Sequence, residues 1–136
     1  MTGSVNSLEG GKRSGHYVAA KHGLIGLMRT VALELASYGV RCNAVCPGVV
    51  DTPMVAWQGA YDMYAGHLGG SHEDYVEASY RYNAIAEVGP IKPQAVAEVA
   101  LWLASDRSEY VTGIALPIDA GHLLLPGFNH SPVRPS

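Results

Sequence analysis

The chain has 136 residues, of which 48% are hydrophobic and 15% are charged, and its formal net charge is −3. This composition is typical of one compact globular domain with a modest core. It lacks the clustered Lys and Arg of a nucleic-acid surface, and no apolar run approaches the roughly 18 residues of a membrane span. We therefore expect a cytoplasmic protein with neither a nucleic-acid nor a membrane partner.

The first predicted element is a long helix over residues 15–38. Residues 1–14 before it are rich in Gly and Ser and show no helix period. Within the helix, apolar residues extend round most of the cylinder, so we expect it to be buried on more than one side. Gly39 is predicted to end it as the C′ glycine. The main stripe recurs every three or four positions, at Tyr17, Ala20, Leu24, Leu27, Met28, Val31 and Leu35.

A buried strand is predicted over residues 40–46, closed by Pro47-Gly48, because this run is rich in β-branched and small residues. Cys42 and Cys46 would share a face of that strand. Four residues of strand separate them by about 13 Å, which is too far for a disulfide. No zinc-type spacing accompanies them, so we predict two reduced core thiols and no metal site.

The remainder of the chain predicts two shorter helices and one strand. Residues 49–90 look largely irregular, except for a helix over about 72–83 with Ser71 as its N-cap. A second helix is predicted over 93–104, a strand over 114–118, and a tail over 122–136. The helix–strand–helix–strand order predicts an α/β fold with a parallel sheet, and two strands are too few for such a sheet alone.

Tyr17 and Lys21 carry the clearest candidate chemistry. They lie four residues apart near the start of the long helix, on one face. A phenol ordinarily ionises at about pH 10, and a neighbouring ammonium group favours the phenolate, which makes an acid/base at neutral pH. Ser4 precedes the tyrosine by thirteen residues and could donate a hydrogen bond to a substrate oxygen. By itself, Y-x-x-x-K also arises by chance, with an interfacial tyrosine and a solvated lysine.

Several motifs in order make the chain resemble the short-chain dehydrogenases/reductases. Y-V-A-A-K continues as A-A-K-H-G-L-I-G-L-M-R-T-V-A-L-E-L-A, like the family's catalytic helix. G-V-R-C-N-A-V and P-G-V-V-D-T-P-M resemble its sixth strand and the loop that follows. A-L-W-L-A-S-D and Y-V-T-G-I-A-L-P-I-D-A-G resemble its last helix and strand. The resemblance implies the C-terminal half of a Rossmann-type doubly wound parallel sheet, with the N-terminal half absent.

The resemblance also implies a set of site residues. Ser4, Tyr17 and Lys21 match the family's catalytic Ser, Tyr and Lys. Tyr17, Lys21 and the loop would contact NAD or NADP, with NAD favoured, and small-molecule alcohols and ketones would be the substrates. For Thr52, the alternative to contact with the cofactor is a role as the N-cap of a following helix. The loop residues implied in cofactor binding are Pro47, Gly48, Val50 and Thr52.

Residues 1–121 would then form a partial catalytic domain, with a substrate lid over about 53–90. Lid residues Trp57, Tyr61, Met63 and Tyr64 would either wall an apolar pocket or pack the lid. The family's long helix implies a homo-oligomer, specifically a tetramer. Within the family, the long lid and the helix motif resemble mycofactocin-associated and carveol-dehydrogenase-like members.

The family's phosphate-binding T-G-x-x-x-G-x-G turn has no match in this sequence. Two hypotheses follow. In the first, the chain is the catalytic part of an oxidoreductase that is inactive alone. In the second, it is a non-catalytic remnant that at most associates with full-length subunits.

Overall fold

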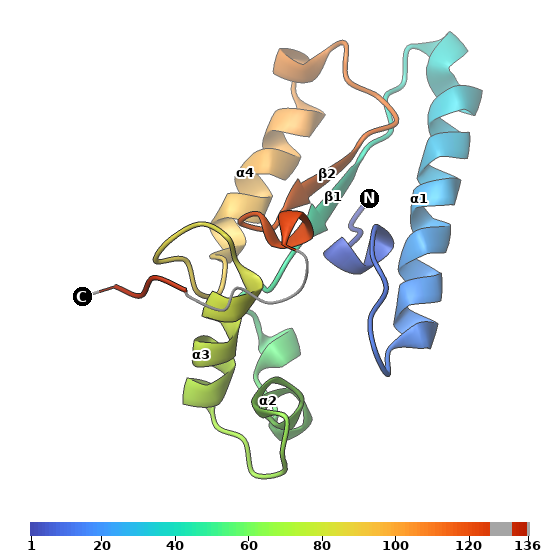
Figure 1. The fold of residues 1–136 in the computed structure, drawn as a ribbon. Coiled ribbons are helices and arrows are strands. Elements are labelled where there is room, and N and C mark those ends of the chain that lie inside the picture. Colours follow the sequence, from blue (N-terminus) through green and yellow to red (C-terminus); the bar gives the residue numbers. More distant parts are fainter. Residues whose placement is uncertain (126–131, 136) are drawn as a thin grey trace. The chain divides into compact units, whose positions relative to one another are not determined.

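The computed structural model describes residues 1–125 and 132–135, and the chain forms two compact units (Figure 1). The first unit comprises residues 1–48 and 94–118, and the second comprises residues 49–93 and 119–136. Of the predicted tail over 122–136, residues 126–131 and 136 lie outside the described residues. The boundary placed at residue 121 stays a prediction.

The long helix of the first unit is α1, Gly15–Leu35, followed by a 3-10 turn over Ala36–Tyr38. Gly39 ends it with φ 71°, the left-handed conformation expected of a C′ glycine. Ile25, Met28 and Ala32 are buried, whereas Leu33 is 80% exposed. Within the described chain, therefore, α1 is covered on one face, although its sequence is apolar nearly all round.

The sheet of the first unit consists of two parallel strands, β1 over Ala44–Pro47 and β2 over Ala115–Ile118. Ala44 pairs with Ala115 and Pro47 with Ile118. Residues 1–3 run along the other edge of β1, where Thr2 forms an isolated parallel bridge with Val45. The core joins Ile25 and Met28 of α1 to Ala44 and Cys46 of β1. The α/β class with a parallel sheet is confirmed.

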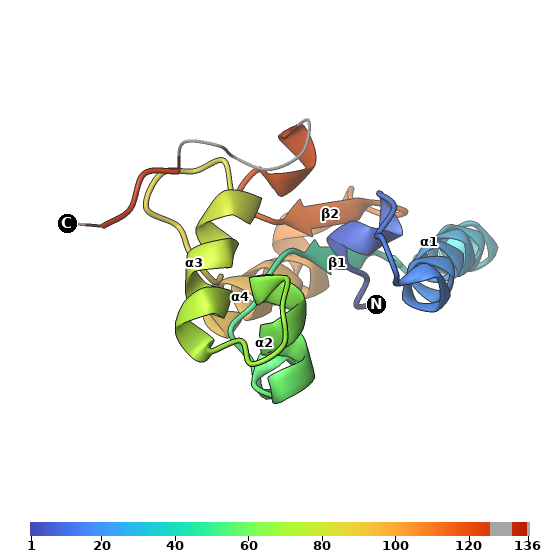
Figure 2. The ribbon, with the colours of Figure 1, turned by 60° about the horizontal axis from the view of Figure 1, so that its bottom comes forward.

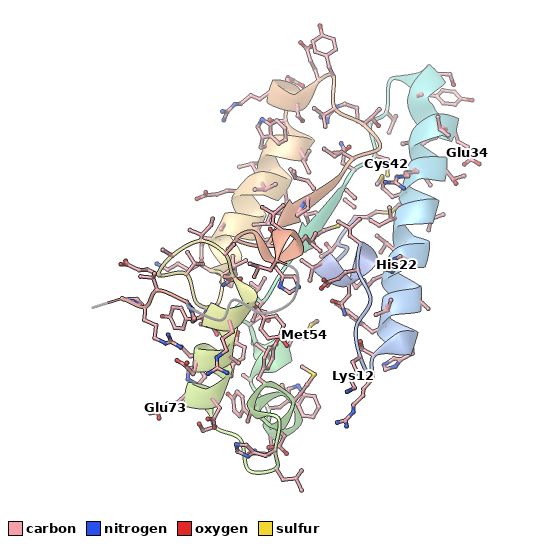
Figure 3. All side chains as sticks on the ribbon, in the orientation of Figure 1. Lys12, His22, Glu34, Cys42, Met54 and Glu73 are labelled. Carbon is pink, nitrogen blue, oxygen red and sulfur yellow. The ribbon has the colours of Figure 1, made fainter. Side chains whose placement is uncertain are left out.

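The predicted strand over 40–46 is wrong in its first half, because residues 40–43 are not in a strand. Their hydrogen bonds go to the segment before β2 in place of a regular ladder. Cys42 N–H donates to the Thr112 hydroxyl at 3.0 Å, and Gly113 N–H donates to the Cys42 carbonyl at 2.8 Å. Figure 3 labels Cys42, which packs against the core between α1 and the strands.

The second helix of the first unit is α4, Pro93–Ala104, which begins and ends where the sequence predicts. β1 and β2 run between α1 and α4 (Figures 1 and 2). Arg41 ties the approach to β1 to the end of α4. Its guanidinium donates to the carbonyls of Leu103 and Ser105 at 2.8 and 3.0 Å. This orders the connection that leads into the sheet.

The second unit contains α2, Gln58–Ala65, and α3, His72–Tyr82, which pack against each other. α3 is confirmed together with its predicted cap, because the Ser71 hydroxyl accepts the Asp74 N–H at 3.1 Å. α2 was not predicted; the sequence indicated irregular structure there. It has only eight residues and one buried side chain, Ala60, which is too little to give a visible helical period.

The C-terminal residues that the structure describes also contact α3 and its surroundings. The His122 ring Nδ1 lies 2.8 Å from the Tyr82 carbonyl. Glu87 N–H donates to the Val133 carbonyl at 2.9 Å, and the Arg134 guanidinium donates to the Glu77 carboxylate. These contacts all lie within the second unit.

Candidate functional site

Ser4 lies at the start of a short 3-10 turn, η1, over Val5–Ser7. It adopts extended backbone after the residues that pair with β1, and its hydroxyl accepts the Asn6 N–H at 3.2 Å. A serine hydroxyl has one hydrogen and two lone pairs. Because the contact with Asn6 occupies a lone pair, the hydroxyl hydrogen remains available to donate to a bound oxygen.

Tyr17 and Lys21 occupy the first turns of α1, and η1 packs against that helix. The Lys21 Nζ lies 5.6 Å from the centroid of the Tyr17 ring. It also donates to the Thr2 carbonyl at 2.9 Å, which fixes the ammonium group beside the segment that carries Ser4. One of its three N–H groups is used in that bond, so others can reach a ligand. The Tyr17 side chain is exposed, at 37%.

The Thr2 carbonyl is a partner that the motif alone does not reveal. A lysine four residues after a tyrosine indicates a shared helix face, but not what holds the long side chain in place. The edge pairing of residues 1–3 with β1 brings this carbonyl to Lys21. The first unit thus contains Ser4, Tyr17 and Lys21 on two packed elements, η1 and α1.

Pro47 and Gly48 end β1 in the same unit, as predicted. Pro47 pairs with Ile118, and the Gly48 N–H donates to the Ile118 carbonyl at 3.0 Å. The Gly48 N–H is therefore committed to the sheet. Its carbonyl is the backbone group at this position that is left for a ligand.

Val50 and Thr52 belong to the second unit, where Val50 forms a parallel bridge with Ile91. That bridge uses the Val49 carbonyl, at 2.8 Å, and the Asp51 N–H, at 3.0 Å. Along an extended chain, the backbone N–H and C=O groups of successive residues point to opposite sides. The N–H and C=O of Val50 therefore point away from Ile91. This geometry suits recognition of a carboxamide, which needs one donor and one acceptor side by side.

Thr52 occupies the N-cap position of a 3-10 turn over Pro53–Val55, but its hydroxyl makes no capping hydrogen bond. The cap is a backbone contact, from the Val55 N–H to the Thr52 carbonyl at 3.0 Å. Thr52 thus occupies the N-cap position, as the alternative prediction has it, but its side chain does not make the capping hydrogen bond. The Thr52 hydroxyl is therefore not used in capping the turn.

The four residues singled out in the predicted lid fall into two groups. Tyr61 and Tyr64 pack on the buried Tyr75, with ring centroids 6.3 and 5.0 Å apart. Trp57 and Met63 are exposed, at 60% and 67%. The two tyrosines therefore help to hold α2 on α3, whereas Trp57 and Met63 leave apolar surface exposed.

The comparisons with known proteins agree on the family. The family model described as enoyl-(acyl carrier protein) reductase matches residues 1–122. The chain belongs to the short-chain dehydrogenase/reductase family. A putative short-chain type dehydrogenase/reductase of Mycolicibacterium smegmatis is 37% identical over 124 residues, which is 91% of this chain and 44% of that protein.

Two further relatives of this family are named for carveol. The (-)-trans-carveol dehydrogenase of Rhodococcus erythropolis is 40% identical over 125 residues, covering 91% of this chain and 45% of that protein. The crystal structure of a Mycobacterium avium carveol dehydrogenase in complex with NAD superimposes with a TM-score of 0.86 at 38% identity. It too is matched over 91% of this chain and 45% of its own length. The chain thus spans less than half the length of these short-chain dehydrogenases/reductases.

Three further observations concern metal ions, membranes and the cysteines. Among the described residues, no group of three or more His, Cys, Asp and Glu side chains is arranged to hold a metal ion. None of the helices in the described part of the chain is both long and apolar enough to cross a bilayer. Cys42 and Cys46 are free thiols, as predicted.

Proposed function

We propose that this chain carries the acid/base residues of an NAD(P)-dependent oxidoreductase that interconverts secondary alcohols and ketones. One observation carries the proposal. The Lys21 ammonium is held at the Thr2 carbonyl and beside the Tyr17 ring, next to the turn on which Ser4 keeps its hydroxyl hydrogen free. Family membership supports the same assignment.

Each residue has a distinct role. The Ser4 hydroxyl donates to the substrate oxygen and orients it. The Tyr17 hydroxyl gives a proton to that oxygen in ketone reduction and takes it back in alcohol oxidation. Lys21 places positive charge beside the Tyr17 ring, which stabilises negative charge developing on the phenol oxygen. When bound, a nicotinamide would supply or accept the hydride at the substrate carbon.

Each residue proposed to hold a nicotinamide offers a group that suits part of that ligand. The unbridged N–H and C=O of Val50 match a carboxamide, and the Thr52 hydroxyl is not used in its cap. Lys21 has further N–H groups for ribose hydroxyls, while Tyr17, Pro47 and Gly48 complete the proposed set. We favour NAD over NADP, because the related Mycobacterium avium carveol dehydrogenase was solved with NAD.

For substrate, we propose cyclic secondary alcohols of terpenoid type. Two of the relatives described above are carveol dehydrogenases. The exposed Trp57 and Met63 of the lid offer apolar surface for such a skeleton. This choice corresponds to the mycofactocin-associated and carveol-dehydrogenase-like subgroup.

The test is an oxidation assay on this chain joined behind the dinucleotide-binding half of the Rhodococcus erythropolis relative. Carveol and NAD, then NADP, are the substrates, and the wild-type fusion is compared with Tyr17→Phe. Because Phe has no transferable proton, turnover should fall by about 10²–10⁴. Tyr38→Phe is the matched control, since Tyr38 is 78% exposed beyond the end of α1. Near-normal turnover of Tyr17→Phe would refute the assignment.

For the 136-residue chain by itself, we propose weak dinucleotide binding and no measurable turnover. The residues assigned above address only the nicotinamide end of the ligand. If contacts to the remainder were worth about 4 kcal/mol, their loss would weaken binding nearly a thousandfold. Calorimetric titration with NAD checks this, and micromolar affinity with turnover would contradict it.

We also propose that the active protein is a homo-oligomer, specifically a tetramer. On α1, Leu27 and Leu33 are 58% and 80% exposed, so apolar surface of the helix away from the buried Ile25, Met28 and Ala32 is uncovered. The same surface serves the second hypothesis, in which the chain acts only by associating with full-length subunits. Light scattering of the fusion and of the 136-residue chain measures association, and the oxidation assay measures turnover. Under the second hypothesis, association occurs without turnover.

A further inference from the structure

The turn that carries Ser4 is closed by a second serine. Ser7 Oγ accepts the Ser4 N–H at 3.1 Å while Ser4 Oγ accepts the Asn6 N–H, so each serine side chain accepts a backbone N–H of the turn. Ser7 is 3% exposed, whereas Ser4 is only partly buried. Ser7 therefore anchors the turn from the inside, and Ser4 stands at its open edge.

Beneath the turn lies β1. A Cβ placed on Gly3 would come within 2.8 Å of Cys46 Sγ and 2.9 Å of Ser7 Oγ, so these groups enclose the Gly3 backbone without room for a side chain. Cys46 is fully buried. Burial raises the pKa of its thiol, although the Ser4 N–H and the Ser7 hydroxyl act in the opposite direction. The turn thus rests on a neutral thiol of the strand.

We propose that Ser7 is a positioning residue that holds Ser4 for contact with the substrate oxygen. The inference rests on the role of Ser4 in the proposed function. Ser7 itself, being buried, does not touch substrate. It acts through the Ser4 N–H, and it also connects the turn to Cys46, one residue before the Pro47-Gly48 end of β1.

The physical reason is the small size of η1. A three-residue 3-10 turn has few hydrogen bonds of its own, here Ser7 N–H to the Ser4 carbonyl at 2.9 Å and Leu8 N–H to the Val5 carbonyl at 2.8 Å. Without Ser7 Oγ, the Ser4 N–H loses its acceptor and the residue can rotate towards other partners. A displacement of about 1 Å at a reacting group costs about a hundredfold in rate.

The first test needs no turnover. Amide hydrogen exchange at Ser4 is measured in the full chain for wild type, Ser7→Ala and Ser7→Thr. We expect exchange at least about fivefold faster in Ser7→Ala, the loss of about 1 kcal/mol of hydrogen bonding, and near-wild-type protection in Ser7→Thr, which keeps the acceptor. Ser37→Ala, at an exposed serine after α1, is the control. Unchanged Ser4 exchange in Ser7→Ala would overturn the proposal.

The second test separates positioning from general stability, using the fusion described above. We expect Ser7→Ala to lower kcat about tenfold and to leave KM within about twofold of the wild-type value. Ser7→Thr should restore kcat. In a Ser4→Ala background, Ser7→Ala should lower kcat no further, because its effect passes through Ser4. Multiplicative losses would overturn the proposal. If the wild-type fusion is inactive, the proposed function fails, while exchange at Ser4 still decides whether Ser7 holds it.

Discussion

The Arg41 guanidinium lies 3.0 Å from the Ser108 hydroxyl, 67 positions further along the chain. The same guanidinium donates to the carbonyls of Leu103, Ser105 and Val111. It thereby satisfies backbone acceptors at the end of α4 and in the connection to β2, which a helix C-terminus otherwise leaves unpaired. One side chain next to β1 thus organises the whole return path to the sheet.

Arg41→Lys should destabilise the first unit. Lysine keeps the charge but cannot present several planar N–H groups to acceptors in different directions. We expect a loss of about 1–3 kcal/mol, because partly buried carbonyls lose their partner. Urea unfolding measures the shift in midpoint, with Arg107→Lys, at an exposed position of the 3-10 turn over Asp106–Ser108, as the matched control. Equal midpoints for the two variants would contradict the role given to Arg41.

The two thiols should react at very different rates with a thiol reagent. Cys46 is fully buried, and burial raises the pKa of its thiol, so the reactive thiolate is scarce. Cys42 is only partly buried. We expect one thiol to react in the folded chain and the second only on unfolding. Cys42→Ser should abolish the early reaction, and an early reaction that survives this change would show that β1 is open.

Tyr75→Phe should leave the second unit as stable as before, or more stable by up to about 1 kcal/mol. The Tyr75 hydroxyl is buried without a hydrogen-bond partner of ordinary geometry among the described residues. The nearby Ser79 hydroxyl donates to the Tyr75 carbonyl, at 2.8 Å. Removing an unsatisfied buried hydroxyl removes a desolvation cost. Thermal unfolding checks this against Tyr110→Phe, where the ring is 92% exposed.

Tyr75 also predicts a loss of stability in strong alkali. Burial, followed by the charge of Asp51, raises the pKa of Tyr75 to about 12 from an ordinary value of 10.0. The folded state favours the neutral phenol, so this contribution is fully present below pH 10.0 and is lost as the pH rises through about 12. The alkaline unfolding curve of Tyr75→Phe should lack this component. Identical curves would contradict burial of the ring.

The contact between Arg134 and Glu77 should open in acid. A hydrogen bond from Arg134 lowers the pKa of the Glu77 carboxyl below its ordinary value of 4.5. The attachment is therefore complete at about pH 6, and it is lost as the pH falls through the lowered pKa. Both side chains are partly exposed, at 41% and 46%, so the effect on global stability is small. The readout is the Arg134 side-chain N–H signal in a pH titration.

Two variants make this titration decisive. Glu77→Gln should remove the acid transition, because the amide carries no charge to titrate. Arg81→Gln should leave it largely in place, since Arg81 lies 3.9 Å from Glu77 and makes the weaker contact. A transition that persists in Glu77→Gln would assign it to another carboxylate.

The sequence by itself determined those elements whose signals are local. The apolar period of α1, the glycine that ends it, the Ser71 cap of α3 and the proline that opens α4 are each written in a few neighbouring residues. The Tyr17 and Lys21 pair also follows from helix periodicity alone. By contrast, α2 is too short to show a period. Residues 40–43 have the composition of a strand, but they do not pair with a neighbouring strand.

Only the tertiary structure decided which segments distant in sequence contact one another. Only the pairing of residues 1–3 with β1 brings the Thr2 carbonyl to Lys21 and places Ser7 over Cys46. Only the bridge between Val50 and Ile91 settles which backbone groups of the loop stay free. Such contacts depend on hydrogen bonds between residues far apart in sequence, and a hydrogen-bonding partner leaves no mark in the local pattern of either segment.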